Sequence, residues 1–393
     1  MLEYLMKIKR QIQREIEFAS KKIGVISIMG PRQSGKTTLA QLVFPNHTYY
    51  NLEDFKLRER IELDPKQFIE NHESGIILDE VQKYPELLSY IQISIDQDFS
   101  PAKFVLTGSE NLLLSEKVSQ TLAGRVAIFQ LLPFSINELV DSHNLKNDYL
   151  SQILHGFYPR IYDQKLEPYN LYPDYIATYI ERDVRQVKNI GNLTNFQRFL
   201  QLLAGRTGQL LNLSSIANDV GVTHKTIESW VSLLESTYIA FKLQPYHENF
   251  GKRVIKSSKL YFYDTGLLCY LLGIDSVKEL RTHSLIGNIF ENMIVADAKK
   301  QVFNQRSSSQ LYFWRDSENN EVDLLIKNAD KLYPIEIKAG SSFSSDYLKG
   351  IKIWDKLQNK QSESYVVYTG DNDLVIGTKV LGWKAAKDLK VII

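Results

Sequence analysis

A glycine-rich stretch that ends in lysine and threonine has the spacing of a phosphate-binding loop. Gly30, Gly35, Lys36 and Thr37 follow the pattern G-x4-G-K-T, between an apolar run and a helical pattern. The N–H groups of such a loop surround phosphate oxygens, the helix N-terminus adds partial positive charge, and Lys36 would neutralise the β- and γ-phosphates as a catalytic residue. We expect ATP to contact Gly30, Pro31, Arg32, Gln33, Ser34, Gly35, Lys36, Thr37 and Thr38.

Acids and hydroxyls elsewhere in the first half would supply a metal site and a base. Thr37 would ligate Mg²⁺, and Asp79, directly after an apolar run, would hold the same ion through water. The adjacent Glu80 would activate the attacking water as a catalytic base. Thr107 and Ser109 end a further apolar run and would orient that water. This set predicts hydrolysis of ATP.

Two arginines near these motifs each have two interpretations. Arg125 follows a helical pattern and would act as an arginine finger that reaches the nucleotide of a neighbouring subunit in a homo-oligomer. The alternative for Arg125 is a surface ion pair. Arg32, inside the glycine-rich stretch, would contact phosphate or brace an acid.

The alternation of apolar runs and helical patterns indicates what would position these residues. Short strands are expected at 24–29, 75–78, 104–107 and 126–131. A helix is expected from Ser34 to Leu42. Short apolar runs separated by helices favour a parallel sheet that is covered on both faces. The predicted fold class is therefore α/β, with a P-loop parallel-sheet ATPase core over 1–145.

The predicted helical region over 146–255 contains a segment that resembles a helix-turn-helix. Helices are expected at 213–220 and 223–236, with Gly221 ending the first and Thr223 capping the second. The second helix has a buried stripe of Ile227, Trp230, Val231 and Leu234. Its outward face carries His224, Lys225, Glu228 and Ser229.

A basic stretch after this segment would form a wing that touches a DNA backbone. It contains Lys252, Arg253, Lys256 and Lys259. Lysine and arginine contacts to phosphates are the usual source of sequence-independent DNA affinity. We therefore expect double-stranded DNA as a partner. The alternative is a winged-helix domain used for packing or for protein contacts.

Acids and a lysine in the predicted last domain, 256–393, form a further candidate site. Glu336 and Lys338 lie on a predicted strand, two positions apart, and so point to one face. Asp323 on the preceding strand would meet them, and Glu291 lies on a predicted helix. These carboxylates would hold a second Mg²⁺ while Lys338 steadies the attacking water, as in a Mg²⁺-dependent phosphodiesterase. The alternatives are a nuclease-like scaffold without activity and ion pairs on a strand surface.

Composition limits the class of protein. The apolar share is 44%, the charged share is 24% and the net charge is +1, so no overall basic field exists. Cys269 is the single cysteine, which excludes a disulfide framework within the chain and a cysteine-based zinc cluster. No apolar run approaches the ~18 residues that span a bilayer, and the N-terminal pattern does not predict a signal peptide. We expect a soluble cytoplasmic protein of two or three domains without a membrane partner.

The ordered motifs of the whole chain resemble a large prokaryotic family. The stretches that carry the resemblance are GPRQSGKTTLA, IILDEVQKYPELL, FVLTGSE, LAGR, YIERDV, KLYFYDTGL, GNIFEN, EVDLLI and PIEIKAG. They are similar to AAA-type P-loop ATPases whose C-terminal half is a domain of unknown function. That half resembles a winged helix followed by an α/β restriction-nuclease-like fold of the PD-(D/E)XK superfamily.

The resemblance also implies roles for individual residues. It places Lys36, Thr37, Asp79 and Glu80 in the nucleotide site. It maps the nuclease triplet and its helix acid onto Asp323, Glu336, Lys338 and Glu291. The chain departs from active helicase-associated nucleases of that superfamily because no Gln-x-x-x-Tyr pattern follows Lys338.

Three functions are compatible with these patterns. The first is a DNA-associated ATPase, whose turnover duplex DNA would stimulate. The second is a Mg²⁺-dependent DNA nuclease coupled to ATP, and the third is a nucleotide-dependent protein-interaction switch. A P-loop kinase is a further alternative for the glycine-rich loop, and Glu80 favours water over a substrate hydroxyl as the nucleophile.

Overall fold

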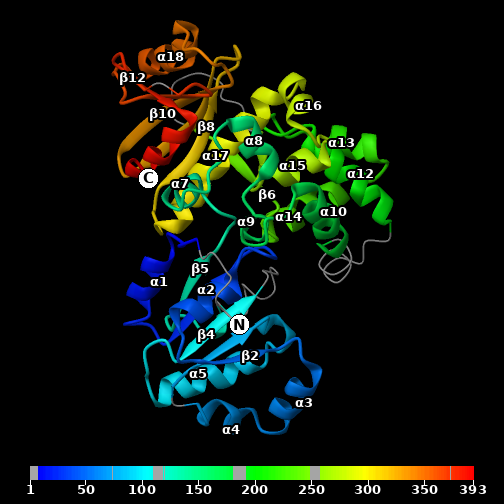
Figure 1. Ribbon diagram of the computed structural model, residues 1–393. Helices are drawn as coiled ribbons and strands as arrows, with labels where there is room; N and C mark the ends of the chain where they lie inside the picture. Colours follow the sequence, from blue (N-terminus) through cyan, green and yellow to red (C-terminus); the bar gives the residue numbers. More distant parts are fainter. Residues whose placement is uncertain are drawn as a thin grey trace.

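The structure is a computed structural model that describes residues 8–72, 74–108, 118, 120–179, 192–247, 257–371 and 373–393. Two sheets lie at opposite ends of the molecule, and a group of helices lies beside the second sheet (Figure 1). The α/β fold class predicted from the sequence is confirmed, with a parallel sheet of five strands followed by helices and a second sheet.

The N-terminal core contains the first sheet and the helices that cover it. Its strands are β1 (Val25–Met29), β2 (Thr48–Asn51), β3 (Ile76–Asp79), β4 (Phe104–Gly108) and β5 (Val126–Gln130). Its helices are α1 (Gln13–Ala19), α2 (Lys36–Val43), α3 (Phe55–Leu63), α4 (Pro65–Glu70), η1 (Val81–Lys83) and α5 (Leu87–Gln97). The four predicted core strands and the predicted helix after the glycine-rich stretch are confirmed to within two residues, whereas β2 was not predicted.

The core sheet is parallel and buried on both faces. Its strand order is β2-β3-β4-β1-β5. Side chains alternate between faces along β1: Val25 and Met29 pack on the side of α3, α4 and α5, whereas Ile26 and Ile28 pack on the side of α1 and α2. All β1 residues are therefore apolar or small, as expected of a strand without a solvent face.

Helices make up most of the middle of the chain. They are α7 (Ile136–Asp141), α8 (Tyr149–His155), α9 (Pro159–Asp163), α10 (Pro168–Tyr179), α12 (Leu193–Ala204), α13 (Leu213–Val220) and α14 (His224–Ser236). Within the described ranges, the structure contains no helix that is both long and apolar enough to cross a membrane.

The last part of the chain builds the second sheet. Its strands are β6 (Ala240–Pro245), β7 (Lys259–Phe262), β8 (Gln310–Arg315), β9 (Glu321–Asn328), β10 (Lys331–Lys338), β11 (Tyr365–Tyr368), β12 (Leu374–Val375) and β13 (Lys379–Gly382). Its helices are α15 (Thr265–Leu271), α16 (Val277–Thr282), α17 (Ile286–Asn304), η3 (Ser345–Leu348), α18 (Lys349–Gln358) and η4 (Trp383–Val391).

The second sheet has the order β12-β13-β11-β10-β9-β8-β6-β7 and is mixed. Strand β9 pairs antiparallel with β8 and β10, and β10 pairs parallel with β11. Ile335 and Ile337 of β10 share a core with α17, whereas Val322 and Leu325 of β9 pack against Trp354 of α18. The two faces are thus covered by α17 and α18.

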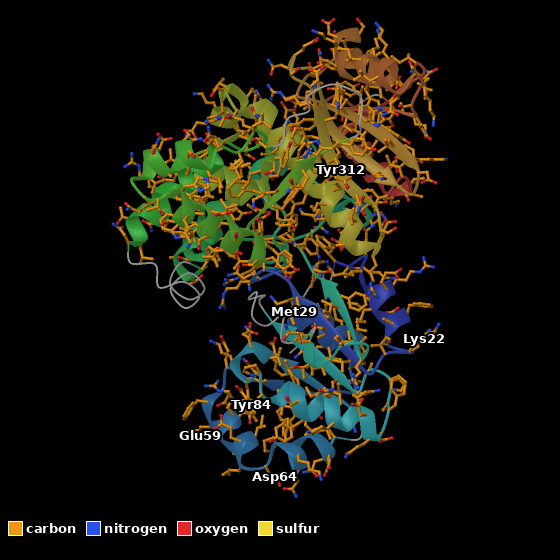
Figure 2. The ribbon with its side chains drawn as sticks, turned by 180° about the vertical axis from the view of Figure 1, so that it is seen from behind. Lys22, Met29, Glu59, Asp64, Tyr84 and Tyr312 are labelled. Carbon is orange, nitrogen blue, oxygen red and sulfur yellow. The ribbon has the colours of Figure 1, made fainter. Side chains whose placement is uncertain are left out.

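The middle and last parts of the chain share one continuous core. Most buried apolar residues between Leu132 and Ile393 belong to a single cluster, and two smaller clusters lie against α18. The predicted domain boundary at 255/256 separates β6 from β7, although these two strands pair with each other. Figure 2 shows Met29, at the end of β1, on the side of the N-terminal core that faces this second body, whereas Glu59 and Asp64 lie on the outer side.

Candidate nucleotide site

The glycine-rich loop lies between β1 and α2, at the carboxyl edge of the core sheet. Gly30 has φ 155° and Gly35 has φ 90°, values that favour glycine. A Cβ atom on Gly30 would lie 2.1 Å from the carbonyl oxygen of Leu131, so no other residue fits there. The strand, loop and helix are therefore arranged as the sequence motif predicts.

The lysine of the motif is turned back onto its own loop. The Nζ atom of Lys36 donates to the carbonyl oxygens of Gly30 at 3.0 Å and Pro31 at 2.8 Å. The side chain is buried, at 6% exposure. This ammonium group is held beside the loop that would surround phosphates, and neutral carbonyl oxygens are weaker partners for it than phosphate oxygens are.

Asp79 lies at the end of β3 and accepts hydrogen bonds from several neighbours. The hydroxyls of Thr37 and Tyr49 each donate to its Oδ2 at 2.8 Å. The Thr107 hydroxyl and the Glu80 N–H donate to its Oδ1. Parallel pairing of β2 and β4 with β3 brings Tyr49 and Thr107 to this edge.

Tyr49 is a site residue that was not predicted from the sequence. Burial raises its pKa above the ordinary range, and the hydrogen bond to Asp79 raises it further, so the phenol stays protonated and donates. The Thr107 hydroxyl, which was expected to orient water, is bonded to Asp79, and Ser109 lies outside the described residues. No local signal could have identified Tyr49, because β2 is a short and half-exposed strand.

Glu80 directly follows Asp79 in a left-handed backbone conformation, with φ 56°. Such a conformation is uncommon for a residue other than glycine and is found preferentially at functional sites. The Gln82 side-chain amide donates to its carboxylate. Glu80 also lines the cavity next to the glycine-rich loop, where a general base is required.

The cavity beside the loop has two walls from distant parts of the chain. Its volume is about 600 Å³, which is in the range of small-molecule sites. One wall is formed by the predicted residues Arg32, Gln33, Gly35, Lys36, Thr37 and Thr38, together with Glu80. The other comes from α9 and its neighbourhood, with Pro159, Arg160, Asp163, Gln164 and Thr178. None of these residues of the second wall belongs to a motif in the sequence.

Arg125 lies at the opposite edge of the core sheet. It precedes the first residue of β5, whereas the glycine-rich loop follows the last residue of β1. Its Nε and Nη2 atoms donate to the carboxylate of Asp96, at 2.5 and 2.8 Å. Within one chain it therefore forms the surface ion pair of the alternative interpretation, and a role toward a neighbouring subunit stays a prediction.

Comparison with protein families divides the chain into three matched segments. Residues 22–140 match a family described as AAA domain. Residues 22–140 are similar to this family, and this segment of the chain is called the AAA domain. Residues 146–278 match a domain of unknown function (DUF8612), and residues 286–386 match another (DUF4143). The AAA domain thus coincides with the parallel sheet and the glycine-rich loop.

Two similar proteins, described as uncharacterized, match most of the chain. Uncharacterized proteins of Mycobacterium bovis and Mycobacterium tuberculosis are each 29% identical over 336 residues, which is 85% of this chain and 74% of theirs. Among solved structures, a Walker-type ATPase of Pyrococcus abyssi has a TM-score of 0.45 and 14% identity, and covers 66% of this chain and 94% of its own.

The acids and the lysine predicted outside the AAA domain come together on the second sheet. The Nζ atom of Lys338 lies 2.6 Å from Asp323 Oδ2 and 2.5 Å from Glu336 Oε2. The Ile337 N–H also donates to Asp323, at 2.8 Å. The expected alternation on β10, with Glu336 and Lys338 on one face, is confirmed.

A second lysine extends this cluster toward α17. Lys259 on β7 pairs with Glu291 of α17, at 3.0 Å, and with Glu321 of β9. The Tyr261 hydroxyl donates to the same Glu291 oxygen, at 2.5 Å. Carboxylate oxygens of Glu291, Glu321 and Asp323 lie within 4.8 Å of one another. Lys259, Tyr261 and Glu321 were not among the predicted members.

Burial and mutual charge set the protonation of this cluster. Burial, and then the charge of Asp323, raise the pKa of Glu336 to about 9. Burial also raises the pKa of Glu291. Burial of Asp323 has the same tendency, but the ammonium groups of Lys338 and Lys259 outweigh it and hold its pKa below the ordinary value. Glu336 therefore carries a proton at neutral pH, while Asp323 is ionised.

The position of Lys259 contradicts its predicted place in a basic wing. Its side chain is 3% exposed and engaged by two carboxylates, so it cannot reach a DNA backbone. The pattern of four basic residues did not reveal that Lys259 begins β7, the last strand in the order of the second sheet, where partners from β9 and α17 surround it. Lys252, Arg253 and Lys256 lie outside the described residues.

The helix-turn-helix segment has the predicted helix limits and buried stripe. Gly221 ends α13 with φ 80°, and the Thr223 hydroxyl accepts from the Thr226 N–H at 3.1 Å. Ile227, Trp230, Val231 and Leu234 are buried. On the outward face of α14, His224, Lys225 and Glu228 are exposed and Ser229 is half-buried. Exposed side chains of both charges on α14 are available to a partner.

Proposed function

We propose that this chain binds ATP with Mg²⁺ and hydrolyses it at the cavity between the glycine-rich loop and α9. The observation that carries the proposal is the meeting of Lys36, Thr37 and Glu80 on one wall of a cavity of about 600 Å³. The match to the AAA domain supports the same conclusion. Loop N–H groups and the N-terminus of α2 would hold the phosphates.

Thr37 and Asp79 fit a magnesium ion. The threonine hydroxyl already donates to the Asp79 carboxylate at 2.8 Å, which leaves its lone pairs for a metal. Mg²⁺ would neutralise charge on the transferred phosphate when it is bound. Removal of the metal with a chelator should abolish turnover, and added Mg²⁺ should restore it.

Side chains of the protein would bind the phosphates and accept the proton of the attacking water. Lys36 would exchange its carbonyl partners for phosphate oxygens, and Glu80 would accept a proton from the attacking water. Arg160, whose Nε donates to Gln164 Oε1 at 2.9 Å, lies on the α9 wall and would place a positive charge opposite the loop. ATP turnover would then change contacts between the AAA domain and the C-terminal half.

ATP turnover by Lys36→Ala and wild type tests the proposal directly. We expect Lys36→Ala to lower turnover by at least about a hundredfold, because it removes charge stabilisation in the transition state. Lys56→Ala, on the exposed face of α3, is the matched control and should hydrolyse ATP normally. Normal turnover by Lys36→Ala would contradict the proposed site.

We also propose that the C-terminal half associates with DNA through α13 and α14. The support is the capped helix pair with an exposed second helix. Duplex DNA should then stimulate ATP turnover, and binding should weaken steeply with salt. Substitution of Lys225 with Glu should remove both effects. If duplex DNA leaves ATP turnover unchanged and DNA binding does not weaken with salt, the results would favour a protein partner and a nucleotide-dependent switch.

A DNA nuclease is the second candidate function, since four predicted residues meet on the second sheet. Asp323, Glu291 and Glu321 are close enough to share one Mg²⁺, but Lys259 and Lys338 already pair with these acids. A metal would have to displace these ammonium groups. Cleavage of DNA by wild type with Mg²⁺, lost in Asp323→Ala and Lys338→Ala, would support this function. Cleavage that persists in both variants would exclude this site.

A further inference from the structure

A buried arginine from the segment before α1 contacts the glycine-rich loop. Arg10 donates from Nη1 to the carbonyl oxygen of Ser34 at 2.8 Å. It also donates from Nη2 to the Leu132 carbonyl oxygen at 2.6 Å, and from Nε to Glu138 Oε1 at 3.0 Å. Its guanidinium lies 4.8 Å from the centre of the Phe134 ring. The glycine-rich loop and the 132–138 stretch therefore converge on one side chain from the segment before α1.

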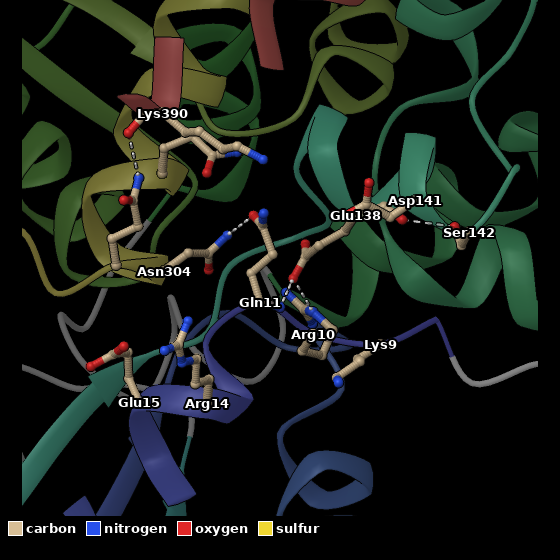
Figure 3. Close-up of a pocket in the computed structure, with 12 residues that line it drawn as sticks. Lys9, Arg10, Gln11, Arg14, Glu15, Glu138, Asp141, Ser142, Asn304 and Lys390 are labelled. Carbon is tan, nitrogen blue, oxygen red and sulfur yellow. Dashed lines mark hydrogen bonds and ion pairs between the residues drawn. The ribbon is translucent and has the colours of Figure 1, made fainter. Parts of the chain in front are cut away.

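The carboxylate of Glu138, the partner of Arg10, also accepts hydrogen bonds from backbone N–H groups. Glu138 forms a capping box at the start of α7: its Oε2 accepts from the Ser135 N–H at 2.8 Å. Its Oε1 also accepts from the Gln11 N–H at 2.8 Å. The Glu138 side chain is fully buried, so its charge is compensated by these donors and by Arg10. Figure 3 shows Arg10 and Glu138 pointing toward each other from separate segments.

The start of α7 is also tied to α17. The Ile136 N–H donates to Asp297 Oδ1 at 2.6 Å, and the Nζ atom of Lys300 donates to the Phe134 carbonyl oxygen at 2.9 Å. Two turns earlier on α17, Asn292 bonds the backbone of Phe262 in β7 at 2.7 and 2.8 Å. A continuous series of hydrogen bonds thus joins the loop to the second sheet.

The hydrogen bond from Arg10 to the Ser34 carbonyl oxygen affects the direction of the Gly35 N–H group. Ser34 C=O and Gly35 N–H belong to one trans peptide, and such a peptide directs these two groups to opposite sides. While Arg10 holds the carbonyl, the Gly35 N–H is directed away from Arg10. A loop that binds phosphate through its N–H groups depends on their orientation being set before the ligand arrives.

We propose that Arg10 is a positioning residue for the phosphate-binding loop, and that Glu138 and Asp297 transmit the state of the C-terminal half to it. The inference rests on the proposed function, because it names what holds the nucleotide loop in place. Movement of α17 against the AAA domain would shift α7 and Glu138, release Arg10 from Ser34 and weaken phosphate binding. Nucleotide binding would restrain α17 by the same route.

Binding of ATP and adenosine by Arg10→Gln tests the positioning role. Both ligands are measured by calorimetry in a Glu80→Gln background, where we expect binding without turnover. The ATP affinity should fall by about tenfold or more, as expected for loss of a charged hydrogen bond. Adenosine affinity should stay unchanged, because adenosine has no phosphate. Arg10→Lys keeps the charge but reaches fewer acceptors, so it should give an intermediate ATP affinity.

Controls separate this outcome from a general loss of folding and from failure of the proposed function. Arg14→Gln changes an exposed arginine one turn further on and should bind both ligands as the background does. Equal losses for ATP and adenosine, or no loss for either, would overturn the positioning role. If the Arg10-containing protein itself binds no ATP, the proposed function and this inference both fail.

A double-mutant cycle between Arg10 and Asp297 tests the transmission. Asp297→Asn changes neither the loop nor any residue that lines the cavity, yet it should weaken ATP binding through α7. The effects of Arg10→Gln and Asp297→Asn should be non-additive by at least about twofold in ATP affinity. An ATP affinity that is unchanged in Asp297→Asn, or additive effects, would overturn the link to the C-terminal half.

Discussion

The nucleotide site and the C-terminal acid cluster contain the same residue types in opposite arrangements. In the nucleotide site, Lys36 donates to carbonyl oxygens, and Asp79 is held by hydroxyl groups and an N–H. In the C-terminal cluster, Lys338 pairs directly with Asp323 and Glu336. In the first site the lysine donates to carbonyl oxygens of the loop beside a cavity, whereas in the second the lysine pairs directly with acids.

This difference indicates which site is prepared for a charged ligand. An ammonium group that rests on neutral carbonyls gains when a phosphate arrives, because charge-assisted hydrogen bonds are stronger. Lys338, between the Asp323 carboxylate and the protonated Glu336, already has such a bond to Asp323 and must lose it before a metal can enter. Convergence of acids on a lysine is therefore weaker support for catalysis than a lysine and a general base that line one cavity.

The largest effect is expected from Glu80→Gln in the nucleotide site. The amide cannot accept the proton of the attacking water, so turnover should fall by about a hundredfold to a thousandfold, while ATP still binds. Steady-state turnover and equilibrium ATP binding measure the two properties. Glu59→Gln, on the outer side of the AAA domain, is the matched control. Loss of binding together with turnover would argue against a role in proton transfer.

In the C-terminal cluster, Lys338→Met should act on stability. It leaves the buried Asp323 carboxylate without its ammonium partner, so the free energy of unfolding should fall by about 2 kcal/mol. Denaturant unfolding measures the change, with Lys352→Met on the exposed face of α18 as control. Added Asp323→Asn should restore part of the loss. A stable Lys338→Met that binds Mg²⁺ would mean that the lysine only blocks a metal site.

The raised pKa of Glu336 predicts a contribution of this cluster to the pH dependence of stability. In the folded chain Glu336 keeps its proton up to about pH 9, whereas in the unfolded chain it loses the proton near its ordinary pKa. The folded state binds more protons between these values, so stability contributed by Glu336 falls as pH rises through this window. The fall is at most about 1.4 kcal/mol per pH unit.

Glu336→Gln removes this titration and measures it. As pH rises from the ordinary carboxyl range to about 9, the unfolding free energy of wild type should fall relative to that of Glu336→Gln. Glu59→Gln should show no such trend against wild type. A constant difference for Glu336→Gln would mean that Glu336 is ionised in the folded chain and that the cluster holds two charged acids on Lys338.

The smallest effect is expected from Arg125→Ala. Its pair with Asp96 is exposed to solvent, and such pairs contribute little to stability, so the unfolding temperature should not change measurably. Turnover is measured over rising protein concentration in wild type and variant. Turnover that rises with concentration only in wild type would support an arginine finger in an assembly. Equal turnover at all concentrations would remove that role.

The fold of the AAA domain and half of its site were predictable because their signals are local. The glycines, Lys36 and Thr37 lie within one loop, and Asp79 and Glu80 directly follow a buried strand. In the last domain, alternation along β10 correctly placed Glu336 and Lys338 on one face. The hydrophobic period of an element and the residue types next to it predict these features without knowledge of the tertiary contacts.

Contacts between distant segments could not be predicted in the same way. Arg10 precedes the AAA domain in the sequence and Arg160 follows it, yet both reach the nucleotide site. Neither residue belongs to a motif. Tyr49 meets Asp79 only because β2 pairs with β3. The sequence predicts Lys259 as a surface cation, but the tertiary structure places it between the carboxylates of Glu291 and Glu321.

The sequence by itself thus determined the phosphate-binding loop, the strands that end in acids, and the helix pair with its buried stripe. Each depends on backbone geometry and periodicity within a few residues. Only the tertiary structure decided which charges meet: Lys36 beside an open cavity, and Lys259 and Lys338 among acids. The physical reason is that strand order and helix packing set the partner of a charge, and the partner decides whether that charge is available to a ligand.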